Sequence, residues 1–547
     1  MVTKNVKKPK TEKPDRRKDK SNKICKGMIV NILISIYFTL RYYLDMLIDY
    51  AFSLYWDEYR QQLPNLEKKH AMLMESAVKL AEKIRKKELK SEDLVTACIE
   101  RIKQVNPILN AVTDQRFEEA LKEAREIDKK IEDGLPDEEF KNKPFLGVPF
   151  TAKESHAVNG MLHTLGIRAR RDVRAEYDAE CVRLLREAGA LPLAVTNVPE
   201  INKWQETRNM VFGQTNNPYD TGRTVGGSSG GEAALHAALA SPISLCSDIG
   251  GSTRMPAFYC GLYGYNPTAG HTSLKGSALR SGEDPTIASI GFVSKHPEDL
   301  APLTKIVAGE KAGLLDLDRK VDIKDIKFYY VEDVKDLRIS PVCSELKKAM
   351  HKVTSKLSKA SEAPKRYSHA GFNHCFALWK HAMTRETEDF AKLLTDNHGR
   401  AYGVIELGKK LIGQSDFTLA AILKLLDEQV FPAVPPAWAD QLTDSLRDDL
   451  ITLLGDTGVL IFPSAPSPCR PHYTLYTGPF NFALWGIFNA LKFPAVQVPV
   501  GLSAGLPLGV QLVAAPGRDA LLLNVAAYLE EHLGGFTPPC AVPLNNA

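Results

Sequence analysis

Short apolar runs alternate with helical patterns along most of the chain. Continuous apolar runs of about four to eight residues are typical of buried strands, whereas apolar positions three and four residues apart indicate helices. On these criteria we expect strands at 146–151, 191–196, 243–246, 459–462, 495–500 and 508–513, and helices at 91–102, 117–131, 179–188 and 232–240. This alternation predicts an α/β fold, in which helices cover a β-sheet.

The region from residue 320 to 440 has a more helical pattern than the segments around it. Within it, FTLAAILKLL at 417–426 is apolar enough for a core helix and also for a helix of a cap that faces a membrane, and both interpretations stay open. No Pro- or Ser-rich linker follows residue 65, and no internal repeat is evident. We therefore expect one large domain at 65–540.

The N-terminal region carries a long apolar stretch, residues 28–40, with only three polar interruptions. After it, Arg41, Asp45 and Asp49 recur every four residues, so on a helix they form one polar stripe. A spanning helix needs about 20 mostly apolar residues. We expect 27–56 to be a membrane anchor, either as a single span or as an in-plane helix whose stripe faces water. A cleaved signal peptide is disfavoured, because the segment before the stretch is too long.

The distribution of charge argues against one class of partner. Charged residues make up 25% of the 547 residues and the net charge is +4. Residues 1–26, however, hold eleven Lys and Arg against three acidic residues. We interpret 1–26 as a basic disordered tail. Because the remainder has no basic excess, a globular face for nucleic acid is not expected.

The spacing of cysteine and histidine limits the chemistry further. Nine dispersed cysteines without a CxxC pair indicate buried thiols rather than a disulfide framework. The histidines show no ligand spacing such as HExxH, so we expect no metal and no cofactor. No Asn-x-Ser/Thr sequon occurs, which favours an intracellular membrane over the secretory lumen.

Two glycine-flanked serine motifs carry the densest chemical signal, VGGSSGG at 225–231 and DIGGSTR at 248–254. Glycine lets a backbone adopt positive φ and approach a ligand closely. Consecutive amides can then point into one anion-binding concavity. In acyl transfer such a concavity is an oxyanion hole, whose donors meet the charge of the tetrahedral intermediate.

A serine nucleophile needs a base, and histidine is the usual one. His236, expected in the middle of a helix, is the only histidine near either motif, and we interpret it as structural. A lysine can serve instead if burial keeps it neutral. Lys153 follows a strand-like apolar run, which suits a desolvated base. Asp248 and Arg254 are interpreted as an ion pair that braces the second motif.

Taken together, GVPFTAK at 147–153, GGSSGGE at 226–232 and DIGGSTR at 248–254 resemble the amidase signature family. Similar blocks elsewhere, TNNPYD at 215–220 and GLPLGVQ at 505–511, extend the resemblance over roughly residues 70–535. Within the family, the chain is most similar to the membrane-attached fatty-acid amide hydrolases of the second type. The resemblance implies a large mixed, twisted β-sheet with helices on both faces, here preceded by an N-terminal membrane helix.

The resemblance also assigns roles to individual residues. Lys153 matches the family's basic lysine, Ser228 its bridging serine and Ser252 its nucleophile. The amides that match the oxyanion hole are those of Ile249, Gly250, Gly251 and Ser252. Asn202 matches a position of the acyl channel, although it is polar here. The family's bridging serine follows a cis peptide bond, which would here join Gly227 to Ser228.

The expected function is that of a serine amidase with a Ser-Ser-Lys triad. It would hydrolyse lipid (fatty-acid) amides, through an acyl-enzyme, to a free fatty acid and an amine or ammonia. The expected partners are the lipid amide and a membrane, and a homodimer is left open. The alternative within the family is an amidase for a non-lipid amide, such as a soluble amidase or the amidase subunit of a tRNA-dependent amidotransferase.

Two rival functions belong to other classes. GGSSG at 226–230 satisfies the G-x-S-x-G pattern of α/β-hydrolases, but this would leave Lys153 and the second motif without a role. A lipid-binding relative without catalysis is the other rival. The intact set of Lys153, Ser228 and Ser252 argues against it.

Overall fold

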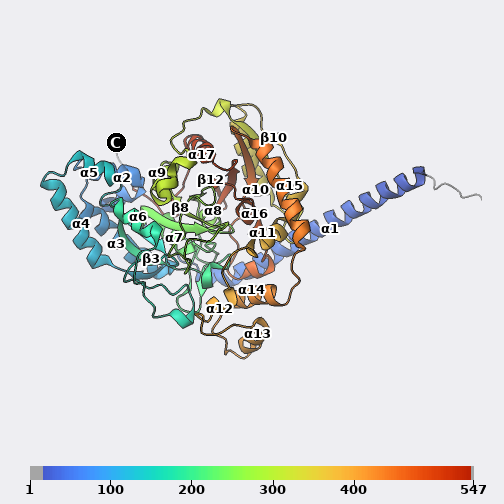
Figure 1. Ribbon diagram of the computed structural model, residues 1–547, viewed down its shortest axis with the longest axis horizontal. Coiled ribbons are helices and arrows are strands. Elements are labelled where there is room, and N and C mark those ends of the chain that lie inside the picture. Colours follow the sequence, from blue (N-terminus) through green and yellow to red (C-terminus); the bar gives the residue numbers. More distant parts are fainter. Residues whose placement is uncertain (1–15, 544–547) are drawn as a thin grey trace, which may run out of the picture.

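A computed structural model describes residues 16–543 of the chain, and its centre is one mixed β-sheet (Figure 1). The sheet has eleven strands in the order β1-β3-β2-β6-β8-β7-β12-β13-β11-β9-β10, and β4 and β5 form a separate pair. The strands are β1 (Val112–Gln115), β2 (Pro149–Lys153), β3 (Leu191–Thr196), β4 (Arg208–Asn209), β5 (Gly213–Gln214), β6 (Ile243–Asp248), β7 (Tyr263–Asn266), β8 (Ser289–Ser294), β9 (Lys327–Tyr330), β10 (Lys365–Arg366), β11 (Gly458–Pro463), β12 (Ala495–Ser503) and β13 (Leu506–Val513).

Parallel and antiparallel pairs are both present in the sheet. β3, β2 and β6 run parallel to one another, as do β11, β9 and β10, while the strands between β6 and β11 pair antiparallel. The α-helices are α1 (Arg16–Trp56), α2 (Ala77–Arg85), α3 (Ser91–Leu109), α4 (Phe117–Glu132), α5 (Asp137–Asn142), α6 (Glu180–Glu187), α7 (Gly230–Ala237), α8 (Arg254–Tyr259), α9 (Leu300–Ala308), α10 (Ser344–Leu357), α11 (Cys375–Met383), α12 (Phe390–Leu393), α13 (Gly403–Leu411), α14 (Leu419–Gln429), α15 (Pro436–Leu454), α16 (Ala483–Leu491) and α17 (Asp519–Leu533).

Alternate residues of a central strand face two different cores. Val459 and Ile461 of β11 pack in one apolar cluster with residues of α9, α10 and α17. Leu460 and Phe462 pack in a second cluster with residues of α11, α15 and α16. Because successive side chains of a strand point to opposite faces, these clusters lie on opposite sides of the sheet. Helices therefore cover both faces, and the expected mixed α/β fold is confirmed.

The expected strands and helices are all present, with bounds shifted by a few residues. Lys153, for example, is the last residue of β2 rather than a residue beyond it. Eight of the nine cysteines are free thiols, which agrees with the interpretation of their spacing.

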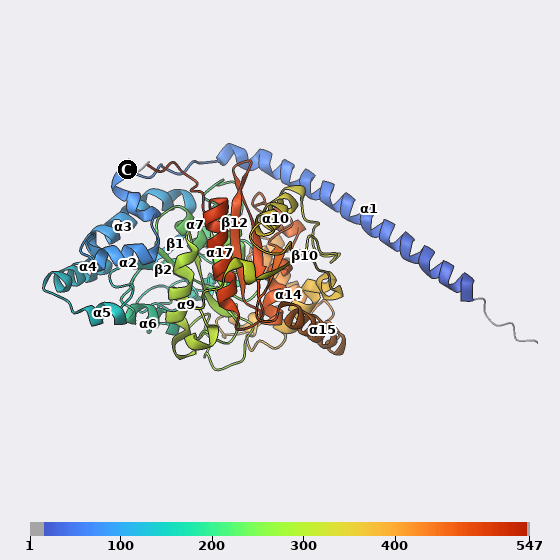
Figure 2. The same ribbon diagram turned by 90° about the horizontal axis from the view of Figure 1, so that it is seen from above.

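Helix α1 extends well beyond the rest of the molecule (Figure 2). It begins at Arg16, inside the segment that we interpreted as a disordered tail, while residues 1–15 lie outside the described part of the chain. Among the described residues, none of the helices combines the length and the apolarity that crossing a membrane requires. The expected single span is therefore not supported, because the apolar stretch of residues 28–40 is shorter than the roughly 20 residues that a span needs, and Arg41 and Asp45 follow it.

The polar stripe of α1 faces protein rather than water or lipid. Asp45 accepts a hydrogen bond from the Ser340 hydroxyl at 2.7 Å, and Asp49 pairs with Arg470 at 2.7 Å. The opposite side of α1 remains exposed and is rich in large apolar side chains. The stripe was recognised correctly as one face of a helix, but the sequence could not show that the domain itself covers it.

Candidate active site

Two neighbouring parallel strands bring the predicted motifs together. β2 ends at Lys153 and β6 ends at Asp248, and the two strands are paired in register from Phe150 to Ala152. In open α/β sheets, ligands bind beyond the carboxyl ends of parallel strands. The serine motif at 225–231 leads into α7, which packs on both strands. The site therefore forms at this edge of the sheet.

Lys153 is fully buried and its ammonium has no acidic partner within ion-pair distance among the described residues. Its Nζ donates to Ser228 Oγ at 2.7 Å and to Ser247 Oγ at 3.2 Å. Burial disfavours the charged form and lowers the pKa of Lys153 to about 7, although Cys246 and Asp248 oppose the shift. A large fraction of Lys153 is therefore neutral near pH 7, as a base must be.

Ser228 follows a cis peptide bond, Gly227–Ser228, as the resemblance implied. A side chain at Gly227 would lie 2.4 Å from the carbonyl oxygen of Trp204, so the close approach of these two segments requires glycine. The next residue, Ser229, donates its backbone amide to the carbonyl of Ser252 at 3.1 Å. The two serine motifs are thus in direct contact.

Ser252 lies at the start of the turn into α8 and is 8% exposed. Among the described residues, its hydroxyl forms no hydrogen bond with Ser228. Gly251 has φ of +105°, and a Cβ there would come within 2.4 Å of Trp485. Its amide donates to Asp248 Oδ1 at 2.7 Å. Of the four amides expected in an oxyanion hole, that of Gly251 is therefore already engaged.

Asp248 and Arg254 form the expected brace. Both side chains are fully buried, and Arg254 Nε donates to Asp248 Oδ2 at 3.0 Å. Burial raises the pKa of Asp248, but the Arg254 guanidinium and the amides of the turn lower it below its ordinary value. Arg254 also donates to Gln511 at 2.8 Å and Asn489 at 2.7 Å. This network fixes the turn that carries Ser252.

Glu232 is a buried acid near Lys153 to which the sequence reasoning assigned no role. It is fully buried in α7 and accepts hydrogen bonds from the hydroxyls of Thr151 and Thr196, both at 2.7 Å. Burial raises the pKa of Glu232 to about 7, and the neighbouring Lys153 opposes that shift. Its position, four residues after Ser228 at the first turn of a helix, was the only signal in the sequence.

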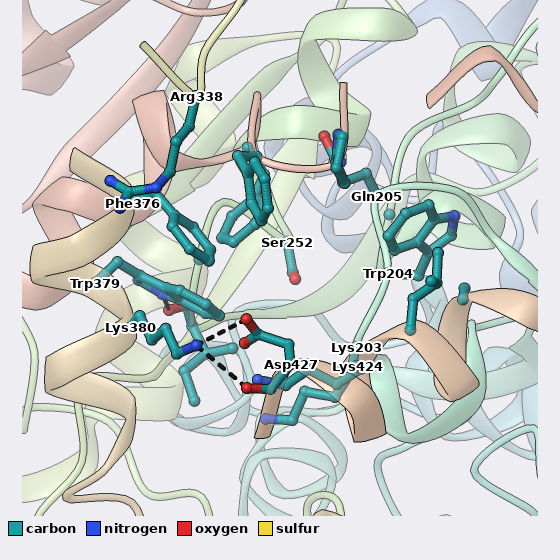
Figure 3. A pocket seen from close by; sticks show the side chains of 18 of the residues that line it. Lys203, Trp204, Gln205, Ser252, Arg338, Phe376, Trp379, Lys380, Lys424 and Asp427 are labelled. Carbon is teal, nitrogen blue, oxygen red and sulfur yellow. Dashed lines mark hydrogen bonds and ion pairs between the residues drawn. The ribbon is translucent and has the colours of Figure 1, made fainter. Parts of the chain in front are cut away.

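A cavity of about 440 Å³ opens beside Ser252 (Figure 3). Phe376 and Trp379 of α11 lie on one side of the Ser252 hydroxyl, and Trp204 lies on the other. The apolar wall is completed by Met255, Ala377, Ala420, Leu423, Phe431, Pro432, Val434, Pro479, Phe480 and Phe482. Asn202, the candidate residue for the acyl channel, also lines the cavity, and so do Lys203 and Gln205. Such a cavity suits an apolar ligand of modest size.

Helix α14 forms part of the wall of the apolar cavity. The sequence had left this helix open to two interpretations, a core helix or a helix of a membrane-facing cap. Ala420, Leu423, Lys424 and Asp427 of this helix line the cavity, and Lys380 of α11 pairs with Asp427 at 2.7 Å (Figure 3). The Trp379 indole donates to the carbonyl of Ile249 at 2.9 Å. The cavity wall and the turn before Ser252 are thus connected directly.

A second, polar cavity of about 30 Å³ borders the same serine. It is lined by Lys153, Ser228, Ser247 and Ser252, and also by Lys203, Arg280 and Glu388. Burial disfavours the ionised form of Glu388, but Lys203 and Arg280 lower its pKa to about 2. This volume is sufficient for a water molecule among polar partners.

The structure brings the predicted site residues to one place. Lys153, Ser228 and Ser252 meet at the small cavity, and Asn202 lies in the wall of both cavities. His236 is buried elsewhere in the core, where its ring contacts Ser244 and the amide of Lys295. Among the described residues, no histidine hydrogen-bonds to Ser228, so nothing supports the G-x-S-x-G alternative. No group of residues in the described part of the chain could hold a metal ion.

Comparison with protein families gives one match that covers most of the chain. The family described as Amidase matches residues 93–523. Fatty-acid amide hydrolase 2 of Homo sapiens is 41% identical over 490 residues, which are 86% of this chain and 91% of that protein. Fatty-acid amide hydrolase 2-A of Danio rerio is 39% identical and covers 89% of this chain and 94% of its own. The 6-aminohexanoate-cyclic-dimer hydrolase of a Pseudomonas strain is 28% identical, and the match covers 84% of this chain and 94% of that protein.

Solved structures share the fold. A structure of fatty acid amide hydrolase superposes with a TM-score of 0.69 at 22% identity and covers 87% of both chains. The 6-aminohexanoate cyclic dimer hydrolase complexed with substrate superposes with a TM-score of 0.67 at 25% identity, over 87% of this chain and all of that one.

Proposed function

The chain belongs to the amidase family and is a hydrolase that acts on amides, and from that premise we propose that it hydrolyses fatty-acid amides with Ser252 as the nucleophile. One observation carries this proposal, namely that Ser252 opens onto an apolar cavity of about 440 Å³. Relatives at 38–41% identity that are named fatty-acid amide hydrolases support the same substrate class.

The proposed base is Lys153 in its neutral form. It takes the proton of Ser228, to which it is joined at 2.7 Å, and Ser228 in turn takes the proton of Ser252. For this relay the hydroxyls of Ser228 and Ser252 must meet once substrate is bound, as catalytic hydrogen bonds often tighten only in the complex. The Ser252 oxygen then attacks the amide carbon.

The negative charge of the tetrahedral intermediate falls on the carbonyl oxygen. We assign its stabilisation to the amides of Ile249, Gly250 and Ser252, because the amide of Gly251 is engaged by Asp248. The proton returns through Ser228 to the nitrogen, so that the amine leaves and an acyl-enzyme remains. A water molecule, for which the polar cavity has room, then releases the fatty acid from Ser252 by the same relay.

The residues that line the two cavities support the proposed substrate class. Phe376, Trp379, Phe480 and Phe482 offer an apolar surface to an acyl chain, since each buried methylene contributes roughly 0.8 kcal/mol. The leaving amine, by contrast, faces the small polar cavity. Asn202 lines both this cavity and the apolar one.

Membrane attachment is the second part of the proposal. With its polar stripe docked on the domain, α1 leaves Leu40 (65% exposed), Tyr43 (63%) and Leu47 (64%) uncovered. These residues are spaced at i, i+3 and i+7 and therefore share one face of the helix. We propose that this face lies in the membrane interface as an in-plane helix. A lipid amide that partitions into the same membrane would then be concentrated near the enzyme.

The test is a comparison of kcat/KM over a series of primary amides with acyl chains from four to eighteen carbons. The proposal predicts that kcat/KM rises with chain length up to a long chain, and that Ser252→Ala abolishes every activity in the series. A higher kcat/KM on a cyclic or hydrophilic amide would instead favour the alternative, an amidase for non-lipid substrates.

A further inference from the structure

The docked face of α1 contacts two segments that also wall the apolar cavity. One segment is 337–340, which contributes Arg338 to the wall. The other is 470–482, which contributes Pro479, Phe480 and Phe482. Because the same two segments touch both α1 and the substrate cavity, the helix is in a position to act on the shape of that cavity.

The first contact is made by Asp45. Its carboxylate is held by Arg41, one turn earlier, at 3.2 Å, and accepts from the Ser340 hydroxyl at 2.7 Å. The Ser340 amide donates to Asn481 Oδ1 at 2.9 Å, and the Asn481 amide nitrogen donates back to Ser340 Oγ at 3.3 Å. The connection therefore runs from α1 through Ser340 to Asn481, which lies between Phe480 and Phe482 of the cavity wall.

The second contact is made by Asp49. Its carboxylate pairs with Arg470, whose side chain is only 4% exposed. Arg470 also donates to the Thr477 hydroxyl at 3.3 Å, while Arg41 donates to the Thr477 carbonyl. Removing the carboxylate of Asp49 would leave a buried guanidinium without its closest partner, a situation that proteins avoid.

The third contact is aromatic and polar. Trp56, at the end of α1, stacks on Tyr473 with ring centroids 5.9 Å apart. Five residues further along the segment, the carbonyl of Gly478 accepts a hydrogen bond from the side chain of Gln205, itself a residue of the cavity wall, at 3.2 Å. The segment 470–482 is therefore held from α1 on one side and from the substrate cavity on the other.

We propose that α1 positions the wall of the substrate cavity, and that Asp45 and Asp49 are positioning residues for the acyl chain. Through Ser340 and Arg470 they fix the wall formed by Phe480 and Phe482. This inference rests on the proposed function and adds to it, because the helix then sets affinity for long acyl chains independently of any membrane. The effect should fall on chains long enough to reach that wall and should spare short ones.

Asp45→Asn and Asp49→Asn test this with soluble anilides of butyric and decanoic acid, both kept monomeric in detergent-free buffer. The expected result is an increase of KM for the decanoyl substrate of about tenfold, with kcat and both butyryl parameters changed less than twofold. Leu54→Ser, at an exposed position of the same helix, is the matched control and should leave all four parameters unchanged. Asp49→Glu retains the carboxylate and should recover most of the decanoyl affinity.

Decanoyl KM values that are unchanged in both Asn variants would overturn the inference, and so would parallel changes for the two substrates. Loss of the proposed function is distinguishable, since the wild-type protein would then hydrolyse the decanoyl anilide no better than the butyryl anilide. A measurement on the wild type avoids any folding defect. If the cavity wall and α1 are coupled, the coupling is reciprocal. A decyl fluorophosphonate on the enzyme should therefore slow hydrogen exchange in residues 41–56 more than an ethyl one does, and equal exchange would contradict the proposal.

Discussion

Replacing Lys153 by methionine should abolish activity and, at neutral pH, stabilise the protein against unfolding. Burial lowers the pKa of Lys153 from 10.5 to about 7. At about 1.36 kcal/mol per pKa unit, the folded state disfavours the ammonium by about 5 kcal/mol. At pH 7, where an unfolded lysine is charged and the folded one is about half neutral, the cost to folding is about 4 kcal/mol. Methionine is similar in shape and avoids this cost.

The stability advantage of Lys153→Met over the wild type should depend on pH. Between pH 7 and 10.5 the unfolded state binds the lysine proton and the folded state does not, so the stability of the wild type rises with pH. The advantage of Lys153→Met should accordingly shrink by about 2 kcal/mol between pH 7 and pH 9. Loss of Lys153 also removes a positive charge that lowers the pKa of Glu232. The higher pKa of Glu232 in Lys153→Met makes the stability advantage of this variant shrink further as the pH rises. The variant also loses the hydrogen bonds of Lys153 to Ser228 and Ser247, which lowers its free energy of unfolding by an amount that does not depend on pH.

The assay is urea unfolding followed by tryptophan fluorescence, for both proteins at pH 7 and pH 9 in one detergent. Lys295→Met is the matched control, because Lys295 is also buried, with its pKa lowered by burial to about 8, but lies outside the site. The stability advantage of Lys295→Met over the wild type should shrink by only about 1 kcal/mol between pH 7 and pH 9, and this variant should keep its activity. A free-energy difference for Lys153→Met that stays the same at both pH values would refute the reasoning, because Lys153 would then be an ordinary charged lysine.

Three further outcomes follow from the same geometry. The kcat/KM of the wild type should rise with pH through about 7, as Lys153 loses its proton, and a rate that falls over pH 6–8 would contradict the assignment. Ser228→Ala should slow amide hydrolysis by roughly 10²-fold or more yet still label with a fluorophosphonate, as a gel assay would show. A combined Leu40→Ser, Tyr43→Ser and Leu47→Ser variant should partition into anionic vesicles roughly tenfold or more weakly in sedimentation, with butyryl anilide hydrolysis unchanged.

Local patterns were sufficient to predict six of the thirteen strands in the described residues and to draw attention to the site motifs. Lys153 and Ser252 each lie within a few residues of a strand end. Periodicity and glycine placement therefore drew attention to Lys153 and to both serine motifs, and the family resemblance then singled out Ser252. The oxyanion amides could be predicted as a set, but not that Asp248 engages the amide of Gly251, because that depends on the three-dimensional turn.

Residues that come from distant segments were beyond such reasoning. Phe376, Trp379 and Phe480 face Ser252 from more than 120 positions away in the chain, and nothing in their own sequence context points to it. The same limit applies to the stripe of α1. Its period of four was visible, whereas its partners Ser340 and Arg470 lie about 300 and 420 residues away.

The central claim is that Ser252 carries the acyl group during hydrolysis of a fatty-acid amide. The most direct measurement is peptide mass spectrometry on enzyme that has been mixed with a long-chain amide and quenched in acid during turnover. The account predicts an acyl group on the peptide that contains Ser252. The same acyl group should accumulate when a long-chain ester is the substrate, and it should be absent in Ser252→Ala. An acyl group on Ser228, or an adduct that persists in Ser252→Ala, would contradict it.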